Sequence, residues 1–215
     1  MAQIFHRSAN HVARATILGA LLLVGLVLGG LMGYVRSPYY TNQGVHREQP
    51  VPFSHQHHVA GLGIDCRYCH TSVETSNFAG LPPTATCMNC HAQIWTNADM
   101  LAPIRESYAS GKPIVWSRVH RLADFAHFNH SIHVSKGIGC ASCHGRIDTM
   151  NLVYQASPLT MQWCLDCHRN PEKFVRPRDQ VTNMNYVAKN QAVDGPRLVK
   201  EYNIRSKTHC STCHY

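Results

Sequence analysis

The chain has 215 residues, 44% of them hydrophobic and 15% charged, which allows one or two ordinary domains and excludes a disordered chain. No collagen or coiled-coil repeat occurs, and 10 Cys with 16 His point instead to disulfides or metal sites. The formal net charge of +8 is compatible with an anionic partner, but no aromatic-interleaved basic stretch or nucleic-acid motif occurs, so we expect no nucleic-acid binding.

An apolar segment lies near the N-terminus. Residues 15–34 carry no charge, and a helix of that length, at about 1.5 Å per residue, spans a hydrocarbon core of roughly 30 Å. A cleavable signal peptide has a shorter apolar core of about 7–15 residues and a small-residue cleavage site. We therefore predict an uncleaved anchor, with Arg7 and Arg14 favouring a cytoplasmic N-terminus. The predicted segments are a cytoplasmic N-terminus at 1–14, a transmembrane anchor at 15–35 and a polar tether at 36–52.

Every cysteine lies in one pentapeptide, Cys-x-x-Cys-His, which is the attachment signature of c-type haem. Two thiols about one helical turn apart can add to both vinyl groups of a porphyrin, and the next residue offers its imidazole to the iron. The predicted attachment residues are Cys66, Cys69, Cys87, Cys90, Cys140, Cys143, Cys164, Cys167, Cys210 and Cys213. The predicted proximal ligands are His70, His91, His144, His168 and His214.

Zinc, disulfide and thiol-redox interpretations explain this pattern less well. Structural zinc uses four ligands, so Cys-x-x-Cys units occur in pairs or with two His, and five copies leave one unpaired. Neither a disulfide framework nor a redox dithiol requires His after every second Cys. We therefore predict five covalent haems. Because haem attachment takes place on the outer face of the energy-coupling membrane, we expect the haem domain in the periplasm, tethered to the cell membrane.

An internal repeat divides the rest of the chain. The pattern Phe-[Ser/Asn]-His-x-x-His-Val, followed by a glycine-containing stretch and a haem motif, occurs at 53–59 and 128–134. It predicts a first two-haem unit with a connecting helix, a second two-haem unit, and an extended arm with the fifth haem. Their boundaries are 53–127, 128–170 and 171–215.

The expected fold is a mostly α-helical and irregular multihaem cytochrome, in which porphyrins form much of the core and regular secondary structure is sparse. Each haem motif should begin a short helix. A longer helix is expected at 97–109, with Asn97 as its cap and Gly111 after its end, although Pro103 interrupts the pattern.

The His-x-x-His pairs are candidate distal ligands, because two His three positions apart face the same side of a helical turn and can reach two porphyrins. The pattern resembles that of small periplasmic multihaem cytochromes, in which the first His ligates the haem next along the chain. This resemblance implies that His55 serves the haem of Cys66 and His130 that of Cys140, while His58 and His133 each reach another haem.

The fifth distal ligand remains open between several residues. We favour His120; Met150, Met161 and Met184 are alternatives, since thioether is the other common axial ligand. We expect His57 and His127 to be solvent-facing or to support the ligands.

The order of these motifs resembles the pentahaem subunit of alternative complex III, most closely over residues 50–175. Phe128 to His133 and Met161 to Pro171 carry this resemblance, together with the segments Pro52 to His55 and Gly63 to His70. It implies an electron-transfer subunit without a substrate-converting site, which relays electrons from quinol oxidation to a periplasmic carrier or terminal oxidase. The partners implied are an iron–sulfur subunit related to molybdopterin oxidoreductases, polytopic quinone-binding subunits and a monohaem cytochrome c. The alternative is a stand-alone membrane-anchored quinol dehydrogenase that feeds a periplasmic reductase.

Overall fold

A computed structural model describes residues 4–215, which divide into one unit that ends at Asn42 and a second unit from Gln43 to Tyr215. The first unit consists of α1 (Ala9–Arg36) and the short α2 (Pro38–Thr41). No side chain of α1 is buried, and the helix is long and apolar enough to cross a membrane, a criterion that an N-terminal signal sequence also meets. The predicted anchor at 15–35 lies within α1, and residues 1–3 of the predicted cytoplasmic segment lie outside the described residues.

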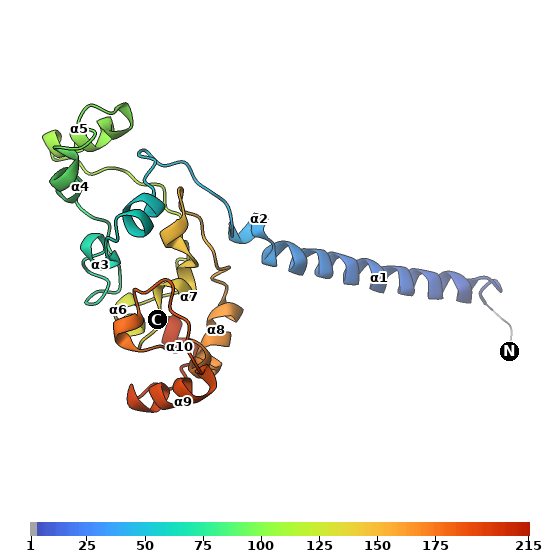
Figure 1. The fold of residues 1–215 in the computed structure, drawn as a ribbon. Coiled ribbons are helices and arrows are strands. Elements are labelled where there is room, and N and C mark those ends of the chain that lie inside the picture. The colour runs from blue at the N-terminus through green and yellow to red at the C-terminus, as the bar shows by residue number, and fades with distance from the viewer. Residues whose placement is uncertain (1–3) are drawn as a thin grey trace. The chain divides into compact units, whose positions relative to one another are not determined.

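The second unit is built from short helices joined by irregular segments (Figure 1). Within residues 4–215 the β-structure is limited to three isolated bridges, so the helical and irregular fold expected from the sequence is confirmed. In Figure 1, α4 and α5 lie at one end of this unit and α9 at the other. Its α-helices are α3 (Cys66–Cys69), α4 (Thr84–His91), α5 (Ala102–Ser110), α6 (His130–Ser135), α7 (Cys140–His144), α8 (Met161–Arg169), α9 (Gln191–Glu201) and α10 (Cys210–Cys213). The π-helix η1 (Gln56–Gly61) and the 3-10 turns η2 (Asp99–Leu101), η3 (Ile147–Thr149), η4 (Pro171–Lys173) and η5 (Arg178–Gln180) complete it.

The helix expected at 97–109 begins later than predicted. After the turn η2, α5 starts at Ala102, so Asn97 is not its cap. Pro103 occupies the first turn of α5, where its missing N–H costs nothing and its fixed φ suits a helix. Gly111 ends the helix as predicted, with a left-handed φ of 70°.

Three haem motifs begin their helices, namely those in α3, α7 and α10, but the expectation is wrong for the other two. Helix α4 starts at Thr84, before Cys87, and α8 starts at Met161, before Cys164. The hydroxyl of Thr160 accepts a hydrogen bond from the backbone N–H of Trp163, which caps α8 one turn upstream of its motif. Both exceptions are the second motif of a predicted two-haem unit.

Side chains form only two small core clusters in the described chain. Val51, Leu101 and Ile104 make the first, beside α5. The second, in the C-terminal segment, consists of Val175, Leu198 and Tyr202. A chain of this length ordinarily buries a larger apolar core. This sparse core is what we expect of a polypeptide that wraps porphyrins.

The residues between the fourth and fifth haem motifs pack against the segment that begins the third motif. Val175 forms an antiparallel bridge with Ile138, and the carbonyl of Val181 accepts a hydrogen bond from the N–H of Cys140. Helix α9 packs against η4. Gly195 permits this approach, because a Cβ there would collide with the carbonyl oxygen of Glu172.

Candidate haem sites

The two copies of the internal repeat adopt the same local geometry. Phe53 stacks on His58, with ring centroids 4.4 Å apart, and Phe128 stacks on His133 at the same 4.4 Å. Each phenylalanine also meets the first His of its pair edge-on, at 4.9 Å for His55 and 4.8 Å for His130. The phenylalanine therefore fixes the orientation of both imidazoles, and the repeat read from the sequence is a repeat in space.

The second His of each pair faces the proximal His of the second motif in its own unit. Ring centroids are 6.2 Å apart for His58 and His91, and 6.0 Å for His133 and His168. Metal–imidazole bonds of about 2 Å on each side, with ring radii of about 1.2 Å, place two axial imidazoles about 6 Å apart. Both pairs therefore fit one iron between them.

Backbone carbonyls hold these imidazoles by one nitrogen. Nδ1 of His58 is 2.8 Å from the carbonyl oxygen of Ser54, and Nδ1 of His133 is 2.7 Å from that of Asn129. A ligating His ordinarily donates its second ring nitrogen in this way, which leaves Nε2 as the metal-binding atom. The same Nδ1-to-carbonyl contact holds the proximal candidates His70, His91 and His214, at 2.7, 3.1 and 2.8 Å.

The other interpretations of the cysteines fit the structure poorly. All ten cysteines are free thiols. Among residues 4–215, no group of three or more His, Cys, Asp or Glu side chains is arranged to hold a bare metal ion. Paired imidazoles beside paired thiols suit covalent haem better than zinc or disulfides.

Five histidines gather beside the first and third haem motifs. Burial, and then the charge of His70, lower the pKa of His55 to about 4. Burial also lowers the pKa of His144 to about 3, with His120 and His130 as the next causes, and that of His120 to about 4. Buried imidazoles with lowered pKa values are neutral at physiological pH, which is the form that binds iron.

His120 lies in this cluster, with its Nε2 3.1 Å from Nδ1 of His144. This contact places the favoured fifth ligand beside the third motif. The methionine alternatives differ in burial: Met150 is 5% and Met184 8% exposed, whereas Met161 is 65% exposed.

The fifth motif is held by the segment just before the second His-x-x-His pair. The carbonyl of Phe125 contacts Nδ1 of His214, the N–H of His127 donates to the carbonyl of Cys213, and the His127 ring stacks on Tyr215 at 4.2 Å. His127 therefore supports the site rather than facing away from it. His57 lies 6.1 Å from the Trp95 ring.

Three features of the sites were not found by sequence reasoning. His46 contacts the carbonyl of Leu152 through Nδ1 at 3.0 Å, the same arrangement as the candidate ligands. Within residues 4–215 the buried Nε of Arg176 has no hydrogen-bond partner, and this guanidinium lies against Gly139, next to an attachment cysteine. A haem propionate is the kind of carboxylate that such a donor fits.

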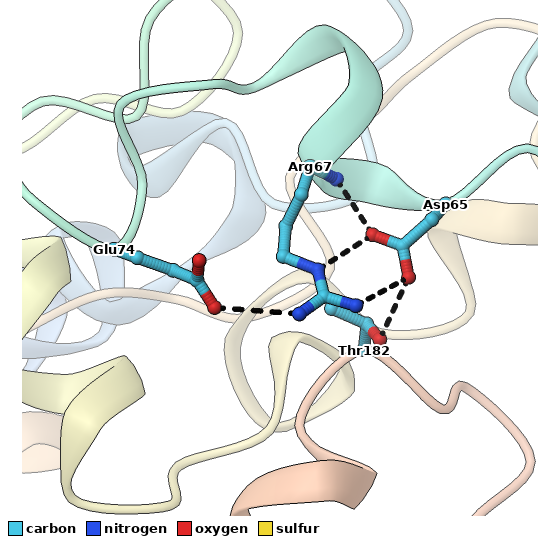
Figure 2. A network of polar contacts seen from close by, with 4 residues as sticks. All are labelled: Asp65, Arg67, Glu74 and Thr182. Carbon is cyan, nitrogen blue, oxygen red and sulfur yellow. Dashed lines mark hydrogen bonds and ion pairs between the residues drawn. The ribbon is translucent and has the colours of Figure 1, made fainter.

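The third feature is a polar network at the first motif (Figure 2). The carboxylate of Asp65 caps α3 by accepting the N–H of Arg67 at 2.9 Å, and it also accepts bonds from the Arg67 guanidinium and the Thr182 hydroxyl. Glu74 contacts the same guanidinium at 3.5 Å. The cap residue directly before the motif was the available signal in the sequence.

Comparison with known proteins shows two similarities. Residues 126–215 match the family described as cytochrome c7 and related cytochrome c. The chain is also 34% identical over 122 residues to the multiheme cytochrome c subunit of menaquinone reductase from Nitratidesulfovibrio vulgaris strain Hildenborough. This alignment covers 56% of the chain and 56% of that relative, so the chain spans little more than half the length of the relative it matches.

Proposed function

We propose that this chain is a multihaem cytochrome c and the electron-transfer subunit of a membrane quinone oxidoreductase complex, a proposal supported by the match of residues 126–215 to the cytochrome c7 and related family. It would carry five covalent haems, one on each Cys-x-x-Cys-His motif, and convert no substrate itself. A bound haem supplies an iron that alternates between the ferrous and ferric states.

One observation carries the proposal: a pair of facing imidazoles about 6 Å apart occurs twice, at His58 with His91 and at His133 with His168. An iron held by both imidazoles of such a pair would have no open position for a substrate, which suits electron transfer rather than catalysis. We assign His58 to the haem of Cys87 and His133 to that of Cys164. Of the remaining candidates, His55, His120 and His130 share the cluster at the first and third motifs.

For the partners and direction we propose the arrangement of alternative complex III. The chain would take electrons from quinol oxidation and pass them to a periplasmic carrier or terminal oxidase. Its partners would be an iron–sulfur subunit related to molybdopterin oxidoreductases, polytopic quinone-binding subunits and a monohaem cytochrome c. The apolar helix α1 would anchor it in the cell membrane, with the haem domain in the periplasm.

The similarity to a menaquinone reductase subunit favours a second candidate, in which electrons flow toward the quinone. The two candidates differ when the purified complex is mixed with a quinol under anaerobic conditions. Rapid reduction of the haems supports quinol oxidation. Oxidation of pre-reduced haems by added quinone, without reduction by quinol, supports the second candidate. A chain that purifies with no membrane partner, as mass spectrometry of the native complex would show, favours a stand-alone quinol dehydrogenase.

Carbon monoxide tests the ligand assignment. We expect the haems of Cys87 and Cys164 in the reduced protein to bind none, because an imidazole would hold each of these irons on both faces. The variant His58→Ala should gain one carbon monoxide site per chain, whereas the control His57→Ala, at the neighbouring position, should gain none. Binding by the haem of Cys87 or of Cys164 in the wild-type protein, or equal binding by both variants, would contradict the assignment.

A further inference from the structure

We propose that the five attachment sites follow one another in space in an order that differs from the sequence, namely the second motif, then the first, the third, the fourth and the fifth. This order rests on the proposed function, since it concerns the haems proposed above. In this order the two predicted two-haem units, residues 53–127 and 128–170, meet at the first and third motifs. The second and fifth motifs lie at the ends of the series.

The central step is a direct contact between equivalent residues. The side chains of Cys66 and Cys140 lie next to each other, since their interaction lowers the pKa of the Cys66 thiol and raises that of the Cys140 thiol. Each is the first cysteine of the first motif in its two-haem unit. The two-haem units therefore meet through equivalent residues, as the two subunits of a two-fold symmetric dimer do. Porphyrins attached to these two sulfur atoms must approach each other at their edges.

The backbone around this contact forms reciprocal hydrogen bonds between the two two-haem units. His130 donates its N–H to the carbonyl of Asn77, in the loop after the first motif. In the other direction, Gln56 donates its N–H to the carbonyl of Met150, in the loop after the third motif. Each His-x-x-His segment therefore rests on the other unit's first haem loop, and this reciprocity makes the contact between the first and third motifs part of the fold.

One short segment also touches both motifs. The carbonyl of Val181 accepts the N–H of Cys140, and the next residue, Thr182, donates its hydroxyl to Asp65 at 3.2 Å (Figure 2). Two neighbouring residues thus connect the start of the third motif to the cap of the first.

The second and fourth motifs lie outside this pair, each on its own unit. The amide of Asn89, inside the second motif, donates to the hydroxyl of Tyr68, inside the first, at 3.1 Å. In the second two-haem unit, the rings of His133 and His168 lie 6.0 Å apart, so the fourth motif lies beside the segment that leads into the third. Figure 1 agrees, because α4 lies at one end of the unit and α8 toward the other.

The fifth motif follows the fourth. The hydroxyl of Ser206, four residues before Cys210, donates to the carbonyl of His168 at 2.7 Å. The series therefore ends at the C-terminal motif.

Matched ligand variants test the order in the full-length holoprotein. Met in place of a distal His raises the reduction potential of that haem alone, so that it can be reduced while the others stay ferric. The number of other haems whose electron paramagnetic resonance signals or midpoint potentials then shift equals its number of neighbours. We expect one shifted neighbour in His58→Met, because the second motif ends the series, and two in His133→Met.

A sequential order would give two shifted neighbours in both variants, and this result would overturn the proposal. Failure of both variants to change any haem would contradict the ligand assignment of the proposed function instead. The order itself is then tested by the iron positions in a structure of the haem-loaded protein. An iron at His144 that is nearer to the iron at His70 than to the iron at His91 supports the proposal, and the reverse overturns it.

Discussion

The network around Asp65 should contribute measurably to the stability of the first haem site (Figure 2). Its carboxylate caps α3, pairs with the Arg67 guanidinium at 2.8 Å and accepts a hydrogen bond from Thr182. We compare two substitutions. Asp65→Ala removes the cap and the charge together, whereas Asp65→Asn keeps an oxygen that can cap α3 and removes only the charge.

The structure gives the two magnitudes separately. Loss of a helix cap costs about 1 kcal/mol. The hydrogen bonds from Arg67, followed by its backbone bond and charge, lower the pKa of Asp65 from 3.8 to about 2 against the opposing effect of burial. That difference corresponds to about 2.5 kcal/mol at most. Because the side chain is 42% exposed, solvent screening reduces the charge contribution to about 1 kcal/mol. We expect Asp65→Asn to lose about 1 kcal/mol and Asp65→Ala about 2 kcal/mol.

The assay is guanidinium unfolding of the haem-loaded protein at pH 7 and pH 3, followed by Soret circular dichroism. Since the folded-state pKa of Asp65 is lowered, its charge contribution is complete above about pH 4 and is lost as the pH falls toward 2. The difference between wild type and Asp65→Asn should therefore be about half as large at pH 3 as at pH 7. Equal stabilities of the two variants at pH 7 would refute the separate capping contribution, and a difference that is independent of pH would refute the charge argument.

Three further predictions concern α9, the fifth motif and α1. Gly195→Ala should destabilise the protein by about 1–2 kcal/mol in thermal unfolding, because the added Cβ collides with the Glu172 carbonyl. The helix propensity of alanine offsets only part of this cost. The control Val193→Ala, at a position 62% exposed on the same helix, should change stability by less than about 0.5 kcal/mol. The pyridine haemochrome assay should find five haems in wild type and four after joint replacement of Cys210 and Cys213 by Ala, and an unchanged count would contradict haem attachment there. Intact mass of the purified protein should include α1, and the protein should stay in the membrane through an alkaline wash; a mature chain that begins after α1 would identify this helix as a signal sequence.

The elements that depend on local sequence were predictable. The motif supplies the thiols and the proximal imidazole within five positions, so its chemistry does not depend on distant contacts. The repeat was also visible, and the matching ring contacts of Phe53 and Phe128 confirm it in space. The start of α5 was misjudged because Asn97 looks like a cap, while Pro103 sets the first turn several residues later.

Pairings between distant segments could not be read from spacing. His58 lies in η1 and His91 at the end of α4, and nothing between these residues in the sequence encodes the separation of their rings. The same holds for Cys66 and Cys140, whose motifs are identical in type to the three others. The sequence gives the ligand inventory, whereas tertiary structure decides which ligands share an iron.

The distinction matters for how such a chain conducts electrons. A count of motifs constrains only how many haems are present, and every order of the five is compatible with the same count. Apart from the approach of Cys66 to Cys140, two contacts that support the proposed order come from side chains outside the motifs, the hydroxyl of Thr182 and the hydroxyl of Ser206. Substitutions at these polar positions should therefore change the coupling between haems while leaving haem number and axial ligands intact. Substitutions within the motifs should do the opposite and remove one haem at a time.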